Sequence, residues 1–151
     1  MAAPLLQTQI DINAPTSKVW ELISDFKRMP QWSPQCRWMK PLGPLRPGTR
    51  TINLNRRGAL FWPTSCIVTE VIPEQKLAFR VTTNGSVWSY ELQPTAEGTR
   101  LIESRHAENG VTAFSTAATK AFMGGVSNFE QELLEGMNAS LQNIKTAAEN
   151  G

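Results

Sequence analysis

The chain has 151 residues, of which 40% are hydrophobic and 19% are charged. A chain of this length buries roughly 70% of the surface that its unfolded form exposes, so it can form a core without metal ions or disulfides. This composition excludes a disordered protein, and a formal net charge of only +2 gives no reason to expect a nucleic-acid partner.

A strand and two short helices are predicted at the N-terminal end. Polar and apolar residues alternate over residues 7–13, as they do in a strand with one buried face. Apolar residues then recur at helical spacing from Val19 to Phe26. This helix is expected to end by Pro30, because a residue before proline is disfavoured in the helical region. A short turn or second helix carrying Trp32 follows.

The middle of the chain alternates between β-rich runs and turn signals. Pro63 indicates a bulge or a late start in one of these runs, and Asn84-Gly85 is a strong hairpin signal. The runs predict strands over residues 37–42, 49–55, 60–72, 77–83, 86–94 and 99–107.

The last part of the chain changes to a helical period. Apolar residues recur at steps of three or four from Phe114 to Ile144, which predicts a long amphipathic helix over about 114–148. The pair Gly124-Gly125 predicts a bend or break near its first third. The predicted order is therefore one strand, a helix pair, about six strands and one long helix.

Two cysteines and one histidine are too few for a disulfide framework or a structural zinc site. We expect Cys36 and Cys66 to be free thiols, and we expect no metal ion or cofactor. The N-terminus lacks the pattern of a signal peptide, and no run approaches the ~18 apolar residues of a membrane span. These features predict a cytoplasmic protein that does not insert into a membrane.

Several segments carry a resemblance to a known family. Residues 12–20 read INAPTSKVW and resemble its opening strand-to-helix segment. Residues 29–34 read MPQWSP and are similar to the segment after the first helix in actinobacterial members. Residues 55–58, 88–92 and 98–104 fit the strands that follow. The family is the START-like, or SRPBCC, superfamily, and within it the polyketide cyclase/dehydrase group.

The resemblance implies a helix-grip fold of the α+β class. Such a fold has a curved antiparallel sheet of about seven strands, two short N-terminal helices and one long C-terminal helix, which together enclose an apolar cavity. Because the resemblance covers nearly the whole chain, residues 1–151 are expected to form a single START-like domain. It does not select one function, because lipid carriers, hormone receptors, cyclases and co-chaperones share this fold.

Two neighbouring strands carry the main candidate site residues. Trp88 and Tyr90 share a strand face, and if that face is concave they line the cavity, with the Tyr90 hydroxyl available to a ligand. Glu103 and Arg105 also share a face; an inward Glu103 needs a partner, which Arg105 can supply, and burial would suit it to acid–base catalysis. The alternatives are plain packing for the aromatic pair and an exposed ion pair for the charged one. Glu103, Tyr90 and His106 are the candidates for catalysis, although a lone histidine is more often a surface residue.

Further candidate ligand contacts lie near the first helices and on the long helix. Aromatic and methionine side chains at helical spacing are mostly core, but the long helix closes the cavity, and methionine adapts to ligands of loose shape. These candidates are Trp32, Trp38, Phe114, Phe122, Met123 and Phe129.

Three functions are compatible with the sequence. The first is binding of a hydrophobic small molecule such as a lipid, a fatty acid or a polyketide-like compound. The second is a cyclase or dehydratase activity, because ring closure of a polyketide needs little more than a shaped cavity and one or two acid–base groups. The third is a protein-interaction module that uses the basic loops of residues 37–57 as a docking surface. Nothing in the sequence specifies an oligomeric state.

Overall fold

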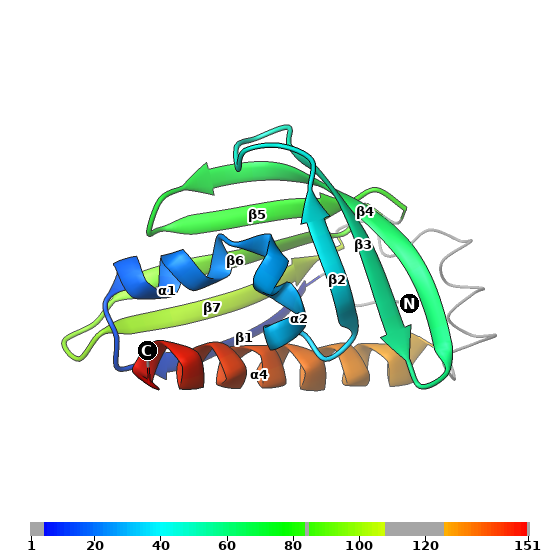
Figure 1. Cartoon of the computed structure of the whole chain (residues 1–151). Helices are drawn as coiled ribbons and strands as arrows, with labels where there is room; N and C mark the ends of the chain where they lie inside the picture. The colour runs from blue at the N-terminus through cyan, green and yellow to red at the C-terminus, as the bar shows by residue number, and fades with distance from the viewer. Residues whose placement is uncertain (1–4, 84, 108–125, 151) are drawn as a thin grey trace.

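A seven-stranded antiparallel sheet in the order β1-β7-β6-β5-β4-β3-β2 forms the body of the molecule (Figure 1). The structure is a computed structural model that describes residues 5–83, 85–107 and 126–150, with side chains in the last range described from Glu130 onwards. The strands are β1 (Leu5–Ile12), β2 (Cys36–Pro41), β3 (Arg50–Arg57), β4 (Leu60–Ile72), β5 (Lys76–Val81), β6 (Val87–Pro94) and β7 (Thr99–His106). The helices are α1 (Thr16–Ile23), α2 (Met29–Trp32) and α4 (Val126–Asn150), and a 3-10 turn, η1, covers Phe26–Arg28. This α+β helix-grip arrangement confirms the predicted fold class.

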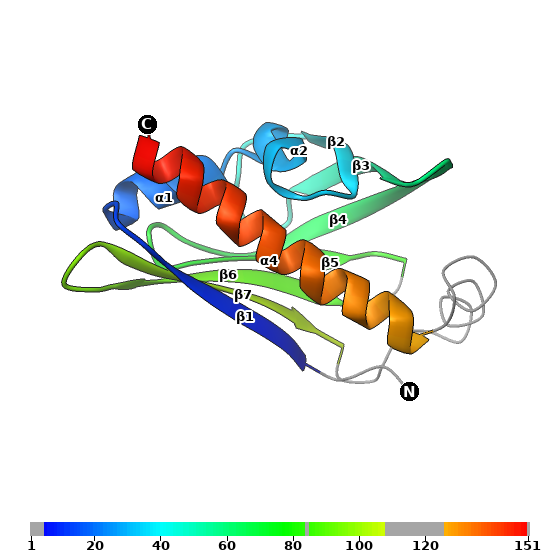
Figure 2. The same cartoon turned by 90° about the horizontal axis from the view of Figure 1, so that it is seen from below.

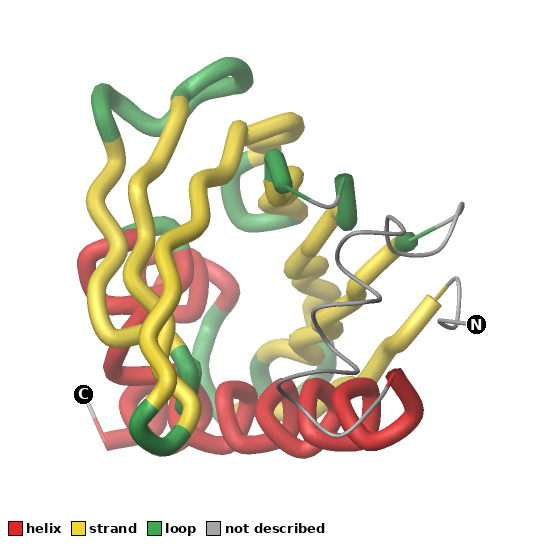
Figure 3. Tube along the Cα trace, turned by 90° about the vertical axis from the view of Figure 1, so that its right-hand side faces the viewer, coloured by secondary structure: helices red, strands yellow, loops and turns green. Residues whose placement is uncertain are grey.

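The sheet curves so that its two ends face one another across the interior, and α4 lies across the open side (Figure 3). Seen from below, α4 crosses the sheet obliquely, with α1 near its C-terminal end (Figure 2). The core fills the space between the concave face of the sheet and the helices. Its fully buried side chains include Ile23, Phe26, Leu77, Leu141 and Ile144. The part of the interior beside α1 and α2 is therefore packed with apolar side chains.

The N-terminal helices agree with the prediction, because the first helix ends before Pro30 and a short second helix carries Trp32. The first helix ends at Ile23, and after η1 a new helix begins at Met29 with Pro30 in its first turn. Proline is tolerated there because the first N–H groups of a helix have no partner within it. Pro30 therefore lies in the first turn of the second helix, the segment for which a short turn or a helix was expected.

Strand β4 also corrects a prediction, because it runs through Pro63 without a bulge or a late start. Pro63 pairs opposite Leu54, and the register irregularity lies further along, between Val68 and Glu70. Since β5 pairs with β4 only from Cys66 onwards, Pro63 lies where β4 is paired on one side alone. Proline is found at such positions because its missing N–H interrupts no ladder on the open side.

The long C-terminal helix is confirmed from Val126 to Asn150. Its predicted start at Phe114 and the predicted bend at Gly124-Gly125 lie outside the described residues. No helix in the described part of the chain is long and apolar enough to cross a membrane.

Strand β3 has its polar side chains inside and its apolar side chains outside. On the concave face, Thr51 is 0% exposed and Asn53 is 6% exposed, whereas on the outer face Ile52 is 44% exposed and Leu54 is 36% exposed. A strand with one solvated face usually buries its apolar side, and a slip of one residue would exchange the two faces. The interior is therefore lined partly by polar groups of β3, a strand for which the sequence did not show which face points inward.

Gly98, in the turn between β6 and β7, allows this turn to approach the end of β1. A Cβ atom at Gly98 would lie 2.3 Å from the Ile12 carbonyl oxygen and 2.6 Å from the Ala14 nitrogen. Because both are backbone atoms, Gly98→Ala should lower the free energy of unfolding by roughly 1–3 kcal/mol in urea denaturation. Gly43→Ala is the control, since nothing lies within 4 Å of a Cβ atom there. Equal loss of stability in the two variants would show that the approach is not as close as described.

Candidate functional site

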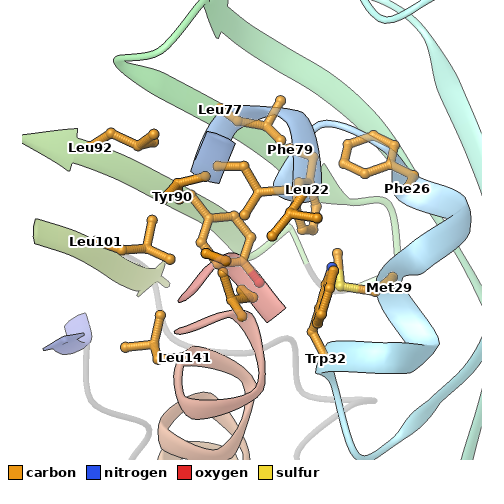
Figure 4. Close-up of a cluster of buried hydrophobic side chains, with 14 of the residues drawn as sticks. Leu22, Phe26, Met29, Trp32, Leu77, Phe79, Tyr90, Leu92, Leu101 and Leu141 are labelled. Carbon is orange, nitrogen blue, oxygen red and sulfur yellow. The ribbon is translucent and has the colours of Figure 1, made fainter. Parts of the chain in front are cut away.

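Tyr90 and Glu103 form a buried hydrogen-bonded pair on the concave face of the sheet. They lie directly opposite one another in the β6–β7 register, and Glu103 is only 4% exposed. The Tyr90 hydroxyl is hydrogen-bonded to the Glu103 carboxyl group. Figure 4 shows Tyr90 in the middle of the apolar cluster, with its hydroxyl on the side of Trp32. A polar pair thus lies inside an otherwise apolar region of the core.

Strand alternation places Trp88 on the same face as Tyr90, and Arg105 on the same face as Glu103. The concave face is the one that these four side chains share. Trp88 is partly buried and packs against the core cluster. The sequence thus predicted correctly which residues would share a face, and the structure shows that this face points inward. Their role in ligand binding stays a prediction.

Burial changes the ionisation of the pair. It raises the pKa of the Glu103 carboxyl from 4.5 to about 8, although the hydrogen bond from Tyr90 lowers it in part. Glu103 is therefore protonated and neutral at pH 7. Burial also raises the pKa of the Tyr90 hydroxyl well above its usual value, and a charge on Glu103 would raise it further. A neutral carboxyl group beside a neutral hydroxyl can both donate and accept hydrogen bonds.

Arg105 makes its described ion pair with α4 and not with Glu103, which corrects the pairing expected from the sequence. The Arg105 guanidinium lies 3.0 Å from a carboxylate oxygen of Glu130, and the two side chains are 3% and 17% exposed. On the opposite wall, Arg57 of β3 forms a bidentate ion pair with Glu132 and lowers the pKa of that carboxyl. Two arginines from opposite sides of the curved sheet therefore hold the N-terminal half of α4.

Trp32 contributes a buried donor near the pair. Its indole Nε1 is buried and has no hydrogen-bond partner among the described residues. Asn143 of α4 donates from Nδ2 to the Trp32 carbonyl oxygen at 2.9 Å, which fixes α2 against α4. The indole ring and the Tyr90 hydroxyl border the same region in Figure 4. Buried N–H groups without a partner are rare, so this donor is an unusual feature of the interior.

The polar wall of β3 and β4 was not recognised from the sequence. Asn53 donates from Nδ2 to Thr64 Oγ1 at 3.1 Å and to Cys66 Sγ at 3.3 Å, and it accepts from Thr51 Oγ1 at 2.8 Å. Asn55 donates to Thr64 Oγ1 at 2.9 Å. The available signal was the alternation of Thr51, Asn53 and Asn55 within a predicted strand, which marks a polar face but not the direction in which it points.

Both cysteines are free, as predicted, and both are buried. Burial raises the pKa of the Cys36 thiol to about 11, and it also raises the pKa of the Cys66 thiol. The two thiols are therefore protonated at neutral pH and poor nucleophiles. Among the described residues, no group of histidine, cysteine, aspartate and glutamate side chains is placed to hold a metal ion.

Two candidate residues lie away from the pair. Trp38 is 48% exposed on the outer face, because the irregularity in the β2 register between Cys36 and Trp38 turns it outward. His106 pairs with Val87 on the face opposite to Arg105, so it cannot act on a group beside Glu103. The candidates Phe114, Phe122 and Met123 lie outside the described residues, as does the side chain of Phe129.

The ionisation of Glu103 should make stability depend on pH. Between pH 4.5 and about 8, the folded protein keeps a proton that the unfolded chain loses, so the free energy of unfolding should fall as pH rises through this window. The slope should approach but not exceed about 1.4 kcal/mol per pH unit. Urea denaturation of wild type and Glu103→Gln across this range measures it, because the glutamine variant stays neutral and should lack the decline. Parallel curves for the two proteins would show that Glu103 ionises normally.

Comparison with family models gives a match over most of the chain. Residues 4–149 match the family described as polyketide cyclase / dehydrase and lipid transport. A comparison with curated protein sequences gives no significant match.

Several solved structures share the fold at low sequence identity. The di-domain ARO/CYC StfQ from the steffimycin biosynthetic pathway is 11% identical to this chain, with a TM-score of 0.79. The alignment covers 97% of this chain and 51% of StfQ, so this chain spans about half the length of that protein. The Polyketide_cyc-like protein Cgl2372 from Corynebacterium glutamicum is 24% identical with a TM-score of 0.65, covering 93% of this chain and 88% of Cgl2372. Protein NE0264 from Nitrosomonas europaea is 19% identical with a TM-score of 0.70, covering 94% and 92%. These structures support the fold, and the match over residues 4–149 shows that the chain belongs to the polyketide cyclase / dehydrase and lipid transport family.

Proposed function

We propose that this protein binds a hydrophobic small molecule between the concave face of its sheet and α4, with an oxygen-bearing end of the molecule at Tyr90 and Glu103. The observation that carries the proposal is the burial of a neutral carboxyl group, whose Oε1 atom has no partner among the described residues. A buried polar atom without a hydrogen bond costs free energy. Small-molecule sites commonly place a few such atoms within an apolar lining.

The surrounding groups favour a neutral end group on the ligand. Trp32 Nε1 can donate a hydrogen bond, while Tyr90 and the protonated Glu103 can donate or accept one. Arg105, the cationic side chain on the same strand face, is already paired with Glu130. A hydroxyl or carbonyl group can use these partners without bringing a charge into the core, which would be costly. A ligand carboxylate would find no unpaired cation on this strand face among the described residues.

The polar wall favours a ligand that carries further oxygen atoms along its length. Thr51 and Asn53 are buried on the concave face, and their hydroxyl and amide groups form a hydrogen-bonded row with Thr64. A plain hydrocarbon chain would leave this row facing an apolar surface. A polyketide-like compound, with oxygen atoms at intervals, is a better match than a fatty acid, and both kinds of ligand fit the description of the family.

A matched pair of probes tests this proposal. 2-Naphthol and 2-methylnaphthalene have the same ring system, and only the first has a hydroxyl group. In displacement of Nile red, wild type should prefer 2-naphthol. Tyr90→Phe should weaken 2-naphthol binding by about two- to tenfold, the effect of losing one hydrogen bond, and leave 2-methylnaphthalene unchanged.

Trp38→Phe is the control, because it alters an aromatic residue on the outer face. It should bind both probes as wild type does. The proposal fails if wild type binds neither Nile red nor 2-naphthol, or if Tyr90→Phe weakens both naphthalenes equally.

A second candidate function is catalysis of ring closure, and the Glu103 pKa of about 8 is the observation that favours it. A general acid works best when its pKa lies near the working pH. As the enol form of one ketone attacks the carbonyl carbon of another, Glu103 could protonate that carbonyl oxygen, while the proton of the enol hydroxyl passes to water. The di-domain ARO/CYC proteins StfQ and BexL share the fold, which gives the candidate further support.

With a linear triketone as substrate, the rate of ring closure should fall as pH rises through about 8, when Glu103 loses its proton. Glu103→Gln should remove this pH dependence and most of the acceleration. If the triketone closes no faster with the protein than in buffer alone, the catalytic candidate is contradicted and ligand binding remains the proposed function.

A further inference from the structure

The outer face of β2, β3 and β4 carries exposed apolar side chains. We call Trp38, Ile52, Leu54 and Phe61 the outer patch. Trp38 and Phe61 are the most exposed of the four, at 48% and 53%. Exposed apolar residues scattered singly are ordinary, but a contiguous group of this kind marks a surface that contacts a partner.

The strand register places the four residues of the outer patch at neighbouring positions of one sheet face. Trp38 lies opposite Leu54, and Leu54 lies opposite Pro63. The neighbouring positions on this face pair Ile52 with Lys40. Directly opposite residues on one sheet face have Cβ atoms about 4.5–5.5 Å apart, so these side chains form continuous rows. The patch follows from the inverted polarity of β3, whose apolar residues face outward.

Three basic residues share the outer face with the patch, and acidic residues are absent from this stretch of sequence. No aspartate or glutamate occurs over residues 26–69, which contain Lys27, Arg28, Arg37, Lys40, Arg46, Arg50, Arg56 and Arg57. Alternation places Lys40, Arg50 and Arg56 on the outer face with the patch. In the described part of the chain these three side chains form no ion pair, and the Arg56 guanidinium lies 5.3 Å from the centre of the Phe61 ring.

We propose that the outer patch docks the protein onto an anionic lipid surface. Aromatic side chains among arginine and lysine suit the boundary of a bilayer, where rings enter the headgroup region and cations meet anionic lipids. The outer face of a curved sheet is convex; a bilayer can deform around it, whereas a protein partner would need a matching hollow.

A second copy of the chain is a poor match for this face, because the two basic surfaces would repel one another. Pairing through the edge of β2 is also disfavoured, since this strand is short and contains a register irregularity, Lys40 and Pro41. The proposal rests on surface residues alone and does not depend on the interior site.

Sedimentation with vesicles tests the docking surface. The full chain should bind vesicles of phosphatidylcholine mixed with phosphatidylglycerol, bind pure phosphatidylcholine much less, and lose affinity as salt is added. Lys40→Gln should lower the partition coefficient about fivefold, as expected for one basic residue at an anionic surface. Trp38→Ser should lower it by a similar factor or more.

Two matched controls make the result specific. Lys18→Gln removes the same charge from α1, and Ile72→Ser removes an exposed apolar side chain at the end of β4. Both should bind the anionic vesicles as wild type does. The proposal is overturned if no vesicle binds, if pure phosphatidylcholine binds equally well, or if the controls lose as much affinity as the patch variants. Binding to polyglutamate in place of vesicles would assign the surface to an acidic protein.

Discussion

The buried carboxyl group of Glu103 constrains the whole interior of this protein. A carboxyl group can remain in an apolar core only if it is neutral and hydrogen-bonded, or paired with a cation. The only cation on its own strand face, Arg105, is held by Glu130 of α4, so Glu103 relies on Tyr90 and stays protonated. The same ion pair fixes α4 over the concave face. The Arg105–Glu130 ion pair therefore has two consequences: it holds α4 in position, and it leaves Glu103 without a cationic partner on its strand face.

The choice of which face of β3 points inward determines both the lining of the interior and the character of the outer surface. Because a strand places alternate side chains on opposite faces, the register that buries Thr51 and Asn53 necessarily exposes Ile52 and Leu54. A strand selected only for stability would bury the apolar pair. Because the polar face of β3 points inward, the strand supplies a polar wall inside and an apolar patch outside. The proposed ligand site uses the polar wall, and the proposed docking surface uses the apolar patch. A site that breaks a local rule of folding is where function is expected to be found.

Local patterns predicted most of the fold. The period-two runs located the strands, the helical period located α4, and alternation correctly grouped Trp88 with Tyr90 and Glu103 with Arg105. Each of these inferences needs only neighbours in sequence. The family resemblance then supplied the arrangement of the sheet and the helix.

The inferences that failed depended on distant or subtle contacts. The partner of Arg105 lies on α4, a long way along the chain, so spacing could not identify it. The outward turn of Trp38 comes from an irregularity in β2 that has no glycine or proline to signal it. For β3, alternation defined two faces, and the assumption that apolar faces are buried would have chosen the wrong one.

The most direct measurement of this arrangement is the ionisation of Glu103 itself, followed by carbon-13 NMR of the side-chain carboxyl in free and 2-naphthol-bound protein. Glu103→Gln assigns the resonance. The structure predicts a titration near pH 8 in the free protein, and a change in this value when the hydroxyl of 2-naphthol occupies the site. A titration near the ordinary value of 4.5 that 2-naphthol leaves unchanged would contradict both the buried neutral acid and its role in binding.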